Sequence, residues 1–157
     1  MMNKSLVEVG AELMTKDEAL DRLIELQTIS GDIRDALALS REVRRREARG
    51  SGAVSMRIAV TEINHKGSSD TTVSALTVKK GVDCGAPDRR PVKLLFLISG
   101  KDGTDEADRV KNRLLRMLSD MRFTSMLCAA KSREEFLRLI EERERRLRDT
   151  DEGSTLQ

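Results

Sequence analysis

The segment Val92–Ile98 is apolar at every position except Lys93, and it has the length of a single β-strand. Successive side chains of a strand point to opposite faces of its sheet. A strand that is apolar at consecutive positions must therefore be covered on both faces. This segment predicts a central strand in a sheet that has a layer of structure on each side.

Helical patterns lie on both sides of this strand in the sequence. Thr15 and Glu18 form a capping box, which marks the start of a helix, and Ser30–Gly31 marks its end. Ser132 and Glu135 repeat the capping pattern at the start of the last helix. Helical spacing gives the expected inward faces: Ala19, Leu20, Leu23, Ile24 and Leu26 in the first helix; Ile33, Ala36, Leu37 and Val43 in a second that begins at Asp32; Val110, Leu114, Met117, Leu118 and Met121 in a third; and Phe136, Leu139 and Ile140 in the last.

Two more strands are predicted between the helical regions. They are Arg57–Thr61 and Val73–Val78, the second of which is rich in β-branched residues. Helices, then strands, then helices around one sheet is the order of an α/β or α+β fold. A chain of 157 residues fits one such domain. We expect it to occupy residues 1–149, followed by a flexible C-terminal tail at residues 150–157.

The balance of charge limits the partners that the chain can attract. It carries 29 basic and 27 acidic residues, a net charge of +2, so no overall field favours a polyanion. Its only aromatic residues are three phenylalanines, too few for a surface that stacks bases. The basic run Arg44–Arg46 is interpreted as a solvated helix face. The alternative is a nucleic-acid-binding module built from this run and the last helix. Glutamates and arginines can pair at i, i+4 along that helix, so nucleic-acid binding is not expected.

The cysteines and the histidine do not form a metal-binding pattern. Cys84, Cys128 and the single histidine, His65, lack the spacing of metal ligands. We therefore expect no metal and no cofactor, and we expect both cysteines to be small buried groups in a reducing compartment. No apolar run has the length of a membrane span, and no signal-like stretch follows the first residues. These observations predict a cytoplasmic protein.

Three segments share their order and spacing with one protein family. They are Arg46–Glu47 with Gly50–Ser51, leading to the strand Ile58–Glu62; Gly81–Asp88 with Pro91 and the apolar strand to Ile98; and Leu127–Glu135. Together they resemble the IIA domains of the fructose/mannitol type in the bacterial phosphotransferase system, including the nitrogen-regulatory branch. The resemblance spans residues 5–142 and implies a single α/β domain with a mixed β-sheet flanked by helices.

The resemblance also implies a chemistry from which this chain departs. In that family one histidine accepts phosphate from the carrier protein HPr, and either passes it to a IIB domain or uses it as a regulatory state. Here the family's Pro-His position reads Thr61 and Glu62, and the glycines of its phosphate turn map to Ala53, Ser55 and Arg57. A glutamate could form only an acyl phosphate, and its ionised form repels an incoming phosphoryl group. We therefore expect a pseudoenzyme that does not catalyse phosphoryl transfer.

These departures predict a IIA-like regulatory or interaction domain that has lost the phosphorelay and acts by protein–protein contact. By resemblance, its partner is an HPr-like protein, a IIB-like protein or a regulated target. Two interpretations of Glu62 remain open: a permanent mimic of phosphohistidine, or simple loss of the relay residue. The phosphoacceptor-equivalent position is Glu62, and the neighbouring site candidates are Arg46, Ser51, Arg57, Thr61 and His65.

His65 supports the alternative function, an active phosphocarrier that accepts phosphate from HPr on a non-standard residue. It lies three positions after Glu62. Because Asn64 and Lys66–Gly67 are typical of a loop, we expect His65 to be a solvent-facing loop residue without a role. Arg46 is the stronger site candidate, because its family counterpart lies near the phosphorylated histidine and a guanidinium steadies phosphate charge.

Overall fold

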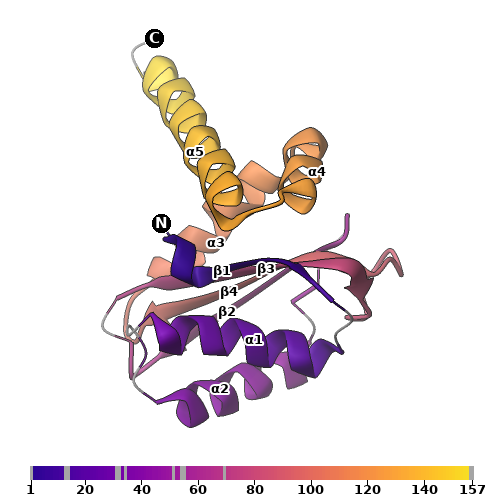
Figure 1. Ribbon diagram of the computed structural model, residues 1–157. Coiled ribbons are helices and arrows are strands. Elements are labelled where there is room, and N and C mark those ends of the chain that lie inside the picture. The colour runs from indigo at the N-terminus through magenta and orange to yellow at the C-terminus, as the bar shows by residue number, and fades with distance from the viewer. Residues whose placement is uncertain are drawn as a thin grey trace.

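A four-stranded sheet lies between two layers of helices (Figure 1). α1 (Lys16–Ile29) and α2 (Ala36–Ala48) cover one face, and α3 (Glu106–Leu118), α4 (Met121–Ala129) and α5 (Arg133–Thr155) cover the other. A computed structural model of the 157-residue chain describes residues 2–12, 15–30, 33, 35–50, 52–53, 56–68 and 70–155, and the side chains up to residue 149.

The sheet is mixed, and its strand order is β1-β3-β4-β2. β1 (Val7–Ala11), which follows the short 3-10 helix η1 (Lys4–Leu6), pairs in parallel with β3 (Thr72–Val82). β3 runs antiparallel to β4 (Val92–Lys101), and β4 pairs in parallel with β2 (Ile58–His65). The predicted central strand is therefore confirmed as β4, and β2 lies at one edge of the sheet.

Two hydrophobic cores explain why β4 is apolar at consecutive positions. Leu95 and Leu97 belong to the core between the sheet and the α1–α2 layer. Phe96 and Ile98 belong to the core beneath α3, α4 and α5. All four side chains are buried, as expected for a strand with both faces covered.

Both predicted capping boxes begin helices. Thr15 Oγ1 accepts a hydrogen bond from the Glu18 backbone N–H at 3.2 Å, and α1 starts at the next residue, Lys16. Ser132 Oγ accepts from the Glu135 N–H at 3.0 Å at the start of α5. Each bond satisfies one of the backbone donors that the first turn of a helix leaves unpaired.

The start of the second helix was predicted too early. α2 begins at Ala36, because the side chain of Asp35 accepts the Ala38 N–H at 3.0 Å and so caps the helix there. Ile33 lies before the helix and forms an isolated bridge with Ser68. Leu37, expected to face inward, is 70% exposed. The predicted start at Asp32 lies outside the described residues.

Pairing with neighbouring strands extends or adds strands that local sequence did not indicate. β2 continues to His65 because Asn64 and His65 pair with Gly100 and Lys101 on β4. This pairing overrides the low strand preference of asparagine. β1 was not predicted; it is short and contains Gly10, whose φ of +71° accompanies an irregularity in its pairing with β3.

Two helical predictions at the C-terminal end also differ from the structure. Met121 was placed on the inward stripe of the third helix, but it is exposed at the start of the separate helix α4. α5 continues to Thr155, so the expected tail from residue 150 begins as helix. Extending an existing helix is easier than nucleating one. Between Arg133 and Gly153 the sequence contains neither proline nor glycine, so nothing ends α5 earlier.

Candidate functional site

The side chains of β2 alternate between the two helical layers, and this alternation organises the candidate site. Thr61 Oγ1 donates to Glu47 Oε1 on α2 at 2.7 Å, and His65 Nδ1 lies 3.0 Å from a carboxylate oxygen of α2. Glu62 instead points to α3, where Lys111 Nζ lies 3.2 Å from its Oε1. Glu62 and His65 are three residues apart and therefore face opposite sides of the sheet.

Glu62, which the resemblance predicts at the phosphoacceptor-equivalent position, forms an ion pair with Lys111. The side chains of Glu62 and Lys111 are 22% and 23% exposed, respectively. At this depth, water screens the pair less than it screens a fully exposed one. The ammonium of Lys111 therefore offsets much of the carboxylate charge at this position, and the pair ties β2 to α3.

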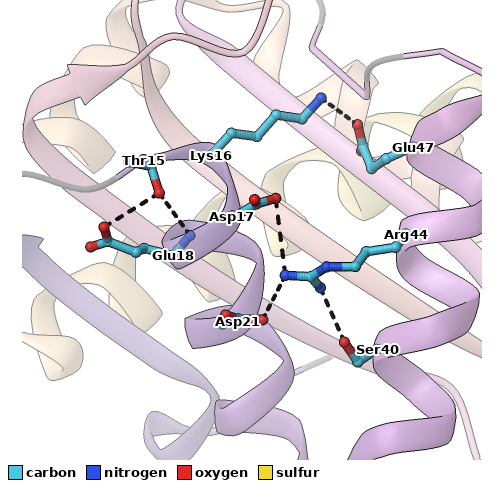
Figure 2. Close-up of polar contacts among 8 residues, drawn as sticks. All are labelled: Thr15, Lys16, Asp17, Glu18, Asp21, Ser40, Arg44 and Glu47. Carbon is cyan, nitrogen blue, oxygen red and sulfur yellow. Dashed lines mark hydrogen bonds and ion pairs between the residues drawn. The ribbon is translucent and has the colours of Figure 1, made fainter.

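Thr61 belongs to a second polar cluster, which joins α1, α2 and the segment before β2. Its hydroxyl and the Gly52 N–H both donate to Glu47 Oε1, at 2.7 and 3.3 Å. Lys16 Nζ lies 2.8 Å from the other carboxylate oxygen. Figure 2 shows this ion pair between α1 and α2. A Cβ on residue 52 would lie 2.5 Å from Thr61 Oγ1, so this close approach requires glycine. The Glu47 side chain is only 9% exposed.

Arg44, the first residue of the basic run, serves the packing of α1 on α2. Its guanidinium donates to Ser40 at 3.0 Å and to Asp21 at 2.9 Å, and it lies 4.0 Å from Asp17 (Figure 2). Arg46 donates to the Gly50 carbonyl at 3.0 Å. These contacts within the chain agree with the interpretation of the run as an ordinary helix face.

His65 is buried, and the prediction of a solvent-facing loop residue is wrong. It ends β2 and is 2% exposed. Its ring packs against Gly67, where a Cβ would lie 2.7 Å from Nε2. Nδ1 is within ion-pair distance of Glu42 Oε2, at 3.0 Å, but neither ring nitrogen has hydrogen-bond geometry with any described residue. The error arose because Asn64 and His65 continue the strand through their pairing with β4, and only Lys66 and Gly67 form the expected turn.

A pocket of about 630 Å³ opens beside the carboxyl-terminal half of β2. One wall comes from α2 and is cationic, and the other comes from the segment leading into α3 and is acidic. Glu62 lies between the two walls. The lining residues are Glu42, Arg45, Arg46, Arg49, Glu62, Ile63, Asn64, Lys66, Asp102, Thr104, Asp105 and Asp108.

The structure brings together only part of the predicted site. Arg46 and Glu62 line the same pocket, whereas Thr61 lies beneath it, in the Glu47 cluster. Arg57 precedes β2 at its other end, where its carbonyl accepts from the Lys93 and Leu94 N–H groups at 2.8 and 3.1 Å. Ser51 lies outside the described residues.

Sequence reasoning missed Lys111 and the acidic wall of the pocket. Lys111 lies 49 residues after Glu62, and only the pairing of β2 with β4, which leads into α3, brings them together. The available signal was the alternation of β2, since it puts Glu62 on the face opposite Thr61. Asp102, Asp105 and Asp108 resemble a solvated helix start, and a single sequence does not distinguish that from a pocket wall.

Neither cysteine is placed as a nucleophile. Cys84 is buried as expected, and burial raises the pKa of its thiol to about 11, against the opposing effect of the nearby Lys16. Cys128 is only partly buried, and burial also raises the pKa of its thiol. Both thiols are therefore protonated at neutral pH.

Neither a metal site nor a membrane-spanning helix is found among the described residues. Within the described ranges, no group of three or more His, Cys, Asp or Glu residues is arranged to hold a metal ion. Among the same residues, no helix combines the length and the apolar character needed to span a bilayer.

Comparison with known proteins identifies one family and one fold. Residues 1–143 match the family described as phosphoenolpyruvate-dependent sugar phosphotransferase system, EIIA 2. This match covers most of the 157 residues and includes β2, the pocket and the Glu47 cluster.

Solved structures share the same fold at low sequence identity. The crystal structure of nitrogen regulatory protein IIA-Ntr from Neisseria meningitidis has a TM-score of 0.81 and 21% identity, covering 88% of this chain and 94% of its own. IIA mannitol from Escherichia coli has a TM-score of 0.77 and 21% identity, covering 88% and 98%. A complex of enzyme IIAMTL with phosphorylated enzyme IIBMTL, also from Escherichia coli, contains a chain with a TM-score of 0.76 and 20% identity, covering 90% and 98%. The expected α/β domain with a mixed sheet flanked by helices is confirmed.

Proposed function

Because this chain belongs to the EIIA 2 family of the phosphoenolpyruvate-dependent sugar phosphotransferase system, we propose that it is a cytoplasmic IIA-type domain that has lost the phosphorelay. In this proposal it acts by contact with a partner protein at the pocket beside β2. The partner is an HPr-like protein, a IIB-like protein or a regulated target.

The placement of Glu62 and His65 on opposite faces of β2 carries this proposal. Glu62, which we assign to the acceptor-equivalent position, is already paired with Lys111. A phosphoryl acceptor must be reached by the donor in line with the breaking bond. His65 is 2% exposed and points to α2, so it does not present a nitrogen on the face that Glu62 occupies. Side chains three residues apart on a strand face opposite sides of the sheet. His65 therefore cannot serve as the acceptor on the face where Glu62 lies.

The two-sided charge of the pocket supports a protein partner. Arg45, Arg46 and Arg49 form its cationic wall, and Asp102 and Asp108 lie on its acidic wall. A protein surface can present acidic groups to the first wall and basic groups to the second, and such complementarity steers encounter and fixes register. The structure of the Escherichia coli IIAMTL–IIBMTL complex is that of a related fold with a protein partner.

For Glu62 we favour simple loss of the relay residue over mimicry of phosphohistidine. Mimicry needs an uncompensated negative charge, and Lys111 lies 3.2 Å from the carboxylate. We expect Glu62→Gln to change the affinity for a IIB-type or HPr-type partner by less than about threefold, since one paired, half-buried charge contributes little to binding. Titration calorimetry of both proteins with the same partner measures this. A loss of tenfold or more, absent in a Lys111→Met variant, would support mimicry instead.

Phosphoryl transfer from phosphoenolpyruvate through enzyme I and HPr tests the loss of the relay directly. Intact mass measured at neutral pH should show no phosphoryl adduct on this chain. A IIA domain that has the family's acceptor histidine, included in the same reaction as a control, should become labelled. An adduct that peptide mapping assigns to His65, and that His65→Gln removes, would restore the active phosphocarrier. An adduct on Glu62 would equally contradict the proposal.

A further inference from the structure

α5 extends the chain beyond the part that matches the family. The match ends at residue 143, whereas α5 continues to Thr155 and projects away from the sheet (Figure 1). The first turn of this extension is held in place, because Leu147 packs against the core beneath α3, α4 and α5. The extension therefore adds a fixed surface next to α3.

A groove of about 600 Å³ lies between this extension and α3. Its apolar part consists of Met117, which is fully buried, and Leu147, which is partly buried. Its charged part contains more basic than acidic side chains. The lining residues are Asn112, Arg113, Arg116 and Met117 from α3, and Glu144, Leu147 and Arg148 from α5.

Two arginines that line the groove, Arg113 and Arg148, differ from arginines that are paired within the chain. Arg109 lies 3.0 Å from Asp105, and Arg143 lies 3.5 Å from Asp120. Arg113 and Arg148 are exposed, and among the described residues neither forms an ion pair or a side-chain hydrogen bond. Within the described part of the chain they are two uncompensated cations, on opposite walls of a groove that has Leu147 between them.

We propose that this groove binds an acidic segment of a partner protein. Carboxylates of that segment pair with Arg113 on α3 and Arg148 on α5, and an apolar side chain between them packs on the partly exposed Leu147. Guanidinium groups are suited to this role, because their planar donors match the geometry of carboxylates. Apolar contact at the centre and charge at the rim is the usual anatomy of a protein interface.

A peptide fits the groove better than a nucleic acid does. Glu144 lies inside it, and the exposed Glu141 and Asp149 belong to the same helix. These carboxylates would repel a continuous phosphate backbone, whereas a peptide can place its charges at separate points. The net charge of +2 and the scarcity of aromatic residues also disfavour a polynucleotide.

This inference does not depend on the function proposed for β2. Arg113 and Arg148 do not line the pocket beside Glu62, and Glu62 does not line the groove. Partner binding at one surface can therefore fail while binding at the other persists.

Fluorescence anisotropy on the full chain at low ionic strength tests the groove. The probe is a labelled peptide that alternates pairs of glutamates with single leucines, and a peptide with glutamine in place of glutamate is its control. We expect saturable binding of the acidic peptide only. The double variant Arg113→Glu/Arg148→Glu should weaken it by about tenfold or more, because it replaces attraction with repulsion at both rims.

A matched variant separates a local effect from a change in overall charge. Arg133→Glu/Arg138→Glu alters net charge equally at exposed positions of α5 outside the groove, and it should change affinity by less than about twofold. Circular dichroism verifies that both double variants are folded. If Arg113→Glu/Arg148→Glu does not fold, Arg113→Gln/Arg148→Gln is measured in its place. Equal losses in the two double variants, no saturable binding, or tighter binding of a DNA duplex of equal charge would overturn the proposal.

Discussion

Replacing Phe136 by alanine should lower the free energy of unfolding by about 3–5 kcal/mol. Phe136 is fully buried at the base of α5, and its ring lies 6.3 Å from that of Phe96 on β4, centroid to centroid. Tilted rings at this separation attract each other beyond the burial of their area. The substitution removes this contact and leaves a cavity between α5 and the sheet.

The loss should be large because, among the described side chains of α5, only Phe136 and Ile140 are fully buried, and Phe136 is the larger. Most of the helix after Ile140 is charged, and Leu147 is only partly buried. Urea unfolding measured by circular dichroism gives the stability of each variant. Phe136→Leu, which keeps most of the apolar volume, should lose about 1–2 kcal/mol. A loss below about 1 kcal/mol for Phe136→Ala would show that α5 is not held to the sheet by this side chain.

Glu47→Ala should be the most damaging substitution in the polar network near the site, with a loss of about 2–4 kcal/mol of stability. The change leaves the Thr61 hydroxyl and the Gly52 N–H without their acceptor, and it leaves the Lys16 ammonium without its partner. The cost of an unpaired buried donor exceeds the gain from an ordinary hydrogen bond. The Lys16 side chain is 33% exposed, so water can solvate its ammonium after Glu47 is removed. This solvation limits the loss of stability to about 4 kcal/mol.

An exposed glutamate provides the matched comparison. Glu142 pairs with Arg146 one turn along α5 at 2.7 Å, and Glu142→Ala should cost no more than about 0.5 kcal/mol. A double-mutant cycle of Glu47→Gln with Thr61→Val should give a coupling of about 1 kcal/mol, as expected for residues in one network. Additive effects in that cycle would contradict the hydrogen bond between these two side chains.

The sequence carries the features of the fold that depend on local pattern. Val92–Ile98 predicts the central strand because a strand buried on both faces leaves a continuous apolar run. Thr15 and Ser132 predict helix starts because a capping hydroxyl needs only the next few residues to act. The assignment of Glu62 to the acceptor position of the family pattern rests on the spacing of the neighbouring segments, and it stays a prediction.

Features that depend on distant pairing could not be predicted in the same way. His65 is buried because β4 extends far enough to pair with it, and nothing next to His65 in the sequence records the length of β4. Lys111 and Glu62 meet only because β4 leads into α3 on the face to which Glu62 points. By contrast, the separation of Arg57 from Glu62 could be predicted from the sequence. The two residues are five positions apart, and five residues of extended strand span roughly 16 Å.

The alternation of β2 also determines which kinds of sequence change this site can absorb. Thr61 reaches Glu47 on one side of the sheet, and the next residue reaches Lys111 on the other. Inserting or deleting a single residue between Ile58 and Thr61 would exchange these directions, so the hydroxyl would meet the ammonium and the two carboxylates would approach each other. The site is therefore more tolerant of a new side chain than of a new chain length in this part of the strand.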